Sequence, residues 1–202
     1  MISDILKWGV AGRPLTGETL SGDLHLVRPV DNGVLVAVAD GLGHGKSAAE
    51  ASAAALTVAE QWAHEPLVQV LQHCHQKLRT TRGAAMSLAF FNAMNSSMTW
   101  VGVGNVEGLL VRSGTDGKRA RESLVSSAGV VGVRLPPLHA RTLKVAAGDT
   151  LILATDGIRR GFGEEAPLAE TPDQTAQGIL ARDGLGTDDA LVLVATYQGR
   201  PR

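Results

Sequence analysis

The stretch VAVADGLGHGKSA, Val36–Ala48, is the most informative part of this chain. An apolar run ends at Asp40, and the three glycines Gly41, Gly43 and Gly45 follow within five positions before a segment typical of a helix begins. A buried strand that ends in a carboxylate, followed by backbone that can adopt positive φ, presents side-chain and main-chain oxygens to a cation. The stretch therefore predicts a strand, a metal-binding loop and a helix in succession.

Further acids lie beside other apolar runs. Asp156 follows LILAT, Asp188 and Asp189 precede ALVLVA, and Asp23 lies in the triplet SGD at the start of an expected strand. One such acid is usually a turn or cap residue. Several at the buried ends of strands are unfavourable without a counter-ion, and oxygen ligands favour Mg²⁺ or Mn²⁺. We therefore expect these acids to form a divalent cation site.

Composition limits the class of protein. The chain has 202 residues, 44% of them apolar, which predicts a single domain over residues 1–202 with a sizeable core. A net charge of −1, few aromatics and no basic stripe argue against nucleic-acid binding. No apolar run is long enough to span a bilayer and the N-terminus lacks a signal peptide, so no membrane association is expected. The single cysteine, Cys74, permits no internal disulfide and favours the cytoplasm.

Hydrophobic patterning predicts the secondary structure. We expect strands at 21–30, 33–40, 84–91, 98–103, 106–112, 143–145, 150–154 and 190–197, helices at 46–64, 66–80 and 172–182, and an exposed loop at 113–122. Strict alternation of strands and helices is absent, which argues against a doubly wound parallel sheet. The prediction is an α+β fold: a sandwich of two mainly antiparallel sheets flanked by helices, with the acids at one end.

Two nucleotide-binding motifs are rejected. A phosphate-binding loop that ends at Ser47 requires glycine at position 40, where Asp40 would repel phosphate. The pair Gly102 and Gly104 lacks the third glycine of a dinucleotide fingerprint, because that position is Glu107.

Zinc binding and serine-nucleophile chemistry have weaker support than the acid site. His73 and His75 diverge on the expected helix, and Cys74 between them is expected to face the core. A Ser-His-Asp triad stays open, although the chain has no G-x-S-x-G elbow.

The order of motifs DGLGHG, GVGN, ATDGI and DDA–LVLV resembles that of the PPM-type, metal-dependent Ser/Thr phosphatases, in particular their SpoIIE branch. The short length, the SGD triplet and the stretch Cys74–Ala84 are similar to the RsbX-type phosphatases, which act alone in the stressosome stress-response pathway. The resemblance covers about residues 8–195. It implies a β-sandwich flanked by helices, with two Mn²⁺ or Mg²⁺ ions at one end.

The resemblance also implies roles for the acids. Asp40 would bridge both ions, and Asp40 and Asp156 would be the catalytic acids. The implied metal ligands are Asp23, Asp40, the carbonyl of Gly41, Asp156, and one of Asp188 and Asp189, with motif alignment favouring Asp188. The ions would activate water for attack on phosphoserine or phosphothreonine, with no covalent phospho-enzyme.

Three further residues are weighed within this resemblance. His44 could protonate the leaving group, but eukaryotic members place a histidine directly after the DG pair, where this chain has Leu42, so we expect His44 to order the loop. Arg13 is expected to be a solvated surface residue, and Asn105 to support turn geometry rather than touch substrate.

The implied substrates are phosphorylated STAS-domain proteins of the stressosome, of the RsbS or RsbR type, with the protein as a monomer or weak dimer. One alternative is a degenerate phosphatase fold that only binds phosphorylated STAS partners. Another is a metal-dependent phosphohydrolase for small molecules, which the absence of a nucleotide loop disfavours. The retained acids favour the active protein phosphatase.

Overall fold

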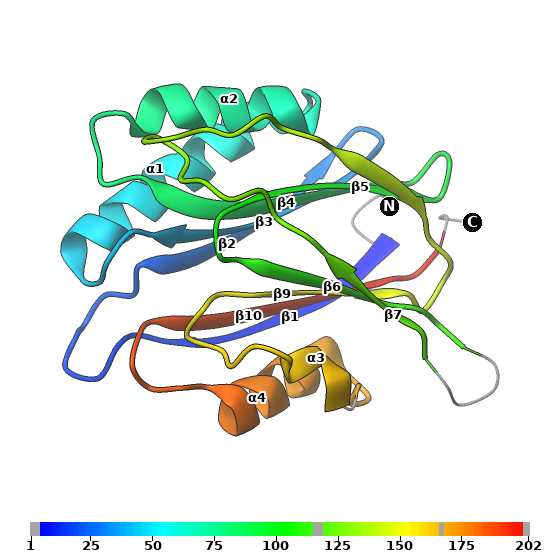
Figure 1. Ribbon diagram of the computed structural model, residues 1–202. Helices are drawn as coiled ribbons and strands as arrows, with labels where there is room; N and C mark the ends of the chain where they lie inside the picture. The colour runs from blue at the N-terminus through cyan, green and yellow to red at the C-terminus, as the bar shows by residue number, and fades with distance from the viewer. Residues whose placement is uncertain (1–4, 115–118, 166–167, 200–202) are drawn as a thin grey trace.

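Two five-stranded antiparallel sheets face each other, and helices cover the outer surface of each (Figure 1). The computed structural model describes residues 5–114, 119–165 and 168–199. One sheet has the order β1 (Leu6–Arg13), β10 (Ala190–Tyr197), β9 (Thr150–Ala154), β6 (Glu107–Val111) and β7 (Arg121–Leu124). The other has the order β2 (Asp23–Val30), β3 (Gly33–Gly41), β4 (Ala84–Asn92), β5 (Ser97–Val103) and β8 (Arg141–Lys144). This arrangement confirms the predicted α+β sandwich.

The continuous apolar run of β3 reflects burial on both of its faces. Val34, Val36 and Val38 pack in the core between the sheets, whereas the alternate residues Leu35 and Ala37 pack in a second core that includes α1 and α2. Side chains of a strand alternate between the two faces of its sheet, so a strand covered on both faces must be apolar throughout. Burial therefore extends to the residue before Asp40.

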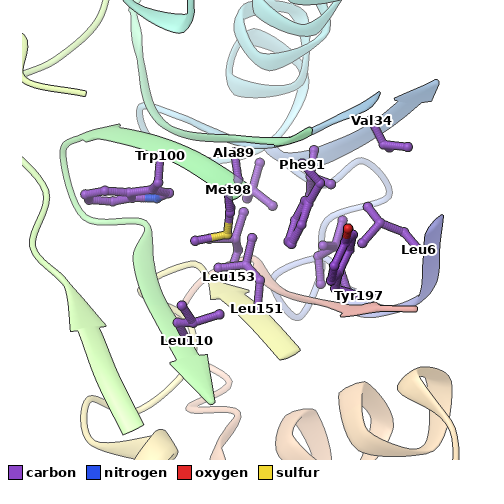
Figure 2. Close-up of a cluster of buried hydrophobic side chains, with 14 of the residues drawn as sticks. Leu6, Val34, Ala89, Phe91, Met98, Trp100, Leu110, Leu151, Leu153 and Tyr197 are labelled. Carbon is purple, nitrogen blue, oxygen red and sulfur yellow. The ribbon is translucent and has the colours of Figure 1, made fainter. Parts of the chain in front are cut away.

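Aromatic and aliphatic side chains from both sheets fill the space between them. Figure 2 shows Phe91 and Met98 from one sheet against Leu151 and Tyr197 from the other. The rings of Phe91 and Tyr197 stack with centroids 6.1 Å apart. This core holds the two sheets together.

Two helices lie on each side of the sandwich (Figure 1). Helices α1 (Lys46–Gln61) and α2 (Leu67–Leu78) cover the β3 sheet, and α3 (Phe162–Glu165) and α4 (Pro172–Asp183) cover the β10 sheet. Alanines make up much of the buried face of α1, which allows close packing. Thr171 and Gln174 form a capping box at the start of α4. None of the helices in these described ranges has the length and apolar character needed to cross a bilayer.

The predicted elements are present, with ends shifted by a few residues. The prediction missed β1, whose sequence carries two glycines, as well as the short polar strand β7 and the four-residue helix α3. Strand β7 begins inside the loop expected at 113–122, of which 115–118 lie outside the described residues. Cys74 is buried, as predicted, and burial raises the pKa of its thiol to about 12.

Candidate metal centre

Asp23 and Asp40 face each other across two neighbouring strands. Asp23 begins β2, Asp40 lies one residue before the end of β3, and the antiparallel register pairs them directly. Such cross-strand partners have Cβ atoms about 4.5–5.5 Å apart. Their carboxylates therefore share one end of the sandwich.

The second sheet brings its acids to the same end. Asp156 follows β9, and Asp188 and Asp189 precede β10, the antiparallel neighbour of β9. Thr155 links the sheets here: its hydroxyl donates to Asp23 Oδ2 over 2.7 Å and accepts from the Leu191 amide over 2.9 Å. The structure thus brings together the acids that the sequence placed in four separate stretches.

Burial and mutual repulsion disfavour the charged forms of two of these acids. Burial, followed by the charge of Asp40, raises the pKa of Asp23 to about 8. Burial, followed by the charge of Asp156, raises the pKa of Asp40 to about 7. Asp188 and Asp189 add to the repulsion at Asp40. A cation among these carboxylates would relieve both effects.

Asp188 and Asp189 are neighbours in the sequence but differ in environment. Asp189 is 3% exposed; its Oδ1 accepts from the Leu15 amide over 2.7 Å and its Oδ2 from the Gly22 amide over 2.8 Å. Asp188 is partly exposed, and its Oδ1 accepts from the Asp189 amide over 2.8 Å. Asp189 therefore fixes the loop before β2, and Asp188 is better placed to contact an ion.

Asn105 contacts two of the acids, although the sequence did not place it among the candidate ligands. Its Nδ2 donates to Asp156 Oδ2 over 2.6 Å, and its side chain also hydrogen-bonds to Asp40, which opposes the rise in the pKa of Asp40. Asn105 Oδ1 is buried and has no hydrogen-bond partner among the described residues. We expected Asn105 to support turn geometry, whereas the structure directs it at the acids. The signal available in the sequence for a site role was its place: Asn105 is a polar residue directly after Gly104, where an apolar strand ends.

Close packing shapes the glycine-rich loop. A Cβ on Gly41 would lie 2.1 Å from the carbonyl oxygen of Ala48, and Gly43 and Gly45 have φ values of 86° and 70°. L-residues with side chains rarely adopt such angles, which accounts for two of the three glycines. His44 Nδ1 lies 2.7 Å from Glu18 Oε1 at the surface. This contact joins the loop to the segment before β2, as expected of a loop-ordering histidine.

Arg13 is exposed at the end of β1, as predicted. Its guanidinium lies near Gly184 and Gly186, just beyond α4.

The donor set fits a hard, partly hydrated cation. No three His, Cys, Asp or Glu side chains within the described ranges converge closely enough to enclose an ion by themselves. Mg²⁺ requires no such cage, because it usually keeps several waters and binds one or two carboxylates. Buried, repelling carboxylates and the unpartnered amide oxygen of Asn105 are groups that a hydrated cation would satisfy.

Comparison with known proteins is consistent with this geometry. The family model described as Stage II sporulation protein E (SpoIIE) matches residues 30–198. Phosphoserine phosphatase RsbX of Bacillus subtilis (strain 168) is 35% identical over 94 residues, which are 46% of this chain and 47% of that protein. The match thus spans about half the length of this relative.

Solved structures share the fold over nearly the whole chain. A chain described under "The bacterial stressosome: a modular system that has been adapted to control secondary messenger signaling" is 30% identical, with a TM-score of 0.85 over 94% of this chain and 98% of that one. RsbX in complex with magnesium has a TM-score of 0.84 at 22% identity, with 96% of each chain covered. The PP2C phosphatase domain of Bacillus subtilis SpoIIE has a TM-score of 0.80 at 18% identity, covering 98% of this chain and 64% of that one.

Proposed function

Because this chain belongs to the SpoIIE family, we propose that it is a metal-dependent protein phosphatase that hydrolyses phosphoserine and phosphothreonine. The observation that carries this proposal is the convergence of Asp23, Asp40, Asp156 and Asp188 at one end of the sandwich. A binding module would have no need to keep these buried, mutually repelling carboxylates.

We infer that Asp40 and Asp156, with Asp23 and Asp188, hold one or two Mg²⁺ or Mn²⁺ ions. The carbonyl of Gly41, which directly follows Asp40, is a further candidate ligand. Bound divalent ions would lower the pKa of water and neutralise charge on a phosphoryl group during in-line attack.

The other residues of the centre position these acids. Asn105 holds the Asp156 carboxylate by a hydrogen bond and also reaches Asp40. Thr155 orients Asp23, and Asp189 fixes the loop that leads into β2 at Asp23. Such outer partners set the orientation of metal ligands and tune their affinity.

We further propose that the substrates are phosphorylated STAS-domain proteins of the RsbS or RsbR type, dephosphorylated in the cytoplasm by this chain as a single catalytic domain. The likeness to RsbX and to a stressosome structure supports the pathway. The single Cys74 supports a reducing compartment.

The test is phosphate release from p-nitrophenyl phosphate and from a phosphorylated STAS-domain protein, with Mn²⁺, Mg²⁺ or chelator. We expect release only with metal, and its loss in Asp40→Asn. Asp31→Asn, an exposed aspartate between β2 and β3, is the matched control and should retain activity. Robust release in excess chelator would reject the metal mechanism. Tight phosphoprotein binding without turnover, with metal bound and the protein folded, would instead support the degenerate binding module.

A further inference from the structure

Arg82 lies beside the glycine-rich loop of the candidate metal centre. The pairing of β3 with β4 continues into this loop, because the Leu42 amide donates to the Gly83 carbonyl over 3.0 Å. The connection from α2 to β4, which carries Arg82, therefore runs along the loop that follows Asp40, at the same end of the sandwich (Figure 1). Arg82 directly precedes Gly83 and is thus at the edge of the site.

The guanidinium of Arg82 reaches over the loop backbone. A Cβ on Gly43 would lie 2.8 Å from Arg82 Nη1. Gly43 has a φ of 86°, which residues with side chains rarely adopt, so the space beside its backbone is left to the guanidinium. Gly43 follows Asp40 and the candidate ligand Gly41 within three positions. The guanidinium therefore lies against the same short stretch that presents two of the candidate ligands to an ion.

The charge of Arg82 is not engaged by another group. Arg82 is exposed, and across the ranges that the structure describes its guanidinium has neither an ion pair nor a hydrogen bond. Arg159 and Arg160, by contrast, pair with Asp183 and Glu107. A ligand that binds Arg82 therefore does not have to break an existing contact.

The charge balance of the centre leaves a role for such a group. Five carboxylates repel one another there, those of Asp23, Asp40, Asp156, Asp188 and Asp189. With every acid ionised, two divalent ions would balance four of these charges and leave one. A phosphoserine adds a further charge of about −1.5 to −2 at neutral pH. A nearby guanidinium would offset part of this repulsion, and its planar fork matches two phosphoryl oxygens at once.

We propose that Arg82 binds the phosphoryl group of the substrate, with its guanidinium donating to two of the phosphoryl oxygens. The proposal rests on the proposed function and deepens it, because it names the residue that holds the substrate phosphate at the metal centre. The guanidinium is farther than ion-pair distance from every carboxylate in the described part of the chain, so it can hold a phosphoryl group without being drawn onto the acids. Gly43 keeps this position open, since a side chain there would press on Nη1.

Direct binding tests Arg82 without requiring turnover. The probe is a fluorescein-labelled nine-residue peptide that carries a non-hydrolysable phosphonate analogue of phosphoserine, and its affinity is read by anisotropy in Mg²⁺. Arg82→Ala should weaken binding roughly tenfold to a hundredfold, the factor expected for lost hydrogen bonds between charged groups. Arg82→Lys, which keeps the charge but not the fork, should recover part of this loss. Arg82 is exposed, so folding is not at risk. Mg²⁺ affinity, measured by calorimetry, should stay within about twofold of the wild type, because the guanidinium is no metal ligand.

Arg79→Ala is the matched control. Arg79 is also exposed and has no ion pair within the described residues, but it lies at the end of α2, three positions before Arg82. It should keep the wild-type affinity for the peptide. Equal affinity of Arg82→Ala and the wild type, the same loss in Arg79→Ala, or a matching loss of Mg²⁺ affinity in Arg82→Ala would overturn the proposal. Failure of the proposed function is a separate result: no metal-dependent phosphate release by the wild type from the authentic phosphoserine peptide, even where the phosphonate peptide binds.

Discussion

Replacing Asp189 with Asn should loosen the loop before β2 and lower the free energy of unfolding, without removing a proposed metal ligand. The carboxylate accepts the Leu15 and Gly22 amides, at 2.7 Å and 2.8 Å, from a position 3% exposed. A hydrogen bond to a charged group contributes about 1.5–3 kcal/mol, and the Asn amide group would set a donor against one of these amides. The Asn oxygen can still accept from the other amide, in a neutral bond of about 0.5–1.5 kcal/mol, so the gross loss is roughly 2–5 kcal/mol.

Relief of repulsion offsets part of this loss. Asp189 lies close enough to Asp23 and Asp40 to raise the pKa of each, so removing its charge favours the metal-free folded state. We expect a net decrease of about 2–4 kcal/mol in the free energy of unfolding. Asp188→Asn, at a partly exposed position, should change it by no more than about 1 kcal/mol.

Two measurements separate the structural role of Asp189 from the ligand role of Asp188. Urea unfolding in chelator gives the stability, and calorimetry without chelator gives Mn²⁺ binding. Asp188→Asn should keep its stability and weaken Mn²⁺ binding, whereas Asp189→Asn should lose stability. The reasoning is refuted if Asp189→Asn unfolds within about 0.5 kcal/mol of the wild type at an unchanged m-value, or if it alone abolishes Mn²⁺ binding.

Three further predictions follow from the site. In chelator, the free energy of unfolding should fall between about pH 4 and pH 8, because Asp23 and Asp40 keep protons in the folded state that the unfolded chain releases, with a slope of up to about 1.4 kcal/mol per pH unit for each group. Urea midpoints at both ends of this range test it; Asp23→Asn should flatten the dependence, and an equally steep curve in that variant would contradict the assignment. Asn105→Ala should weaken Mn²⁺ binding about 10–100-fold in calorimetry, and unchanged affinity would show that Asn105 does not position the ligands. His44→Ala, which breaks the exposed contact with Glu18, should cost no more than about 1 kcal/mol and leave the shape of the pH–rate profile unchanged, whereas loss of its alkaline limb would identify His44 as the general acid.

The sequence alone located the elements that carry the site. The apolar run of β3 predicted burial on both faces, and the structure shows its side chains alternating between two cores. Strict alternation of strands and helices is absent from the sequence, which argued against a doubly wound parallel sheet and favoured the sandwich. Strand β7 was missed because RESL has no apolar alternation, and β1 because its two glycines weaken the pattern. Strand β1 forms through pairing with β10 at the other end of the sequence, and β7 through pairing with β6, the strand before it. Local propensity encodes neither pairing.

Only the tertiary structure separated residues that look alike in the sequence. Asp188 and Asp189 are adjacent and chemically identical, but their environments differ because the loop between β1 and β2 donates two amides to Asp189, whereas Asp188 accepts the amide of its own neighbour. Asn105 and Asp156 are 51 residues apart and meet because β6 pairs with β9. Local patterns determine which residues end a strand, since burial and turn chemistry act over short stretches. Which strand ends share one edge depends on sheet order and register, which are set by long-range packing.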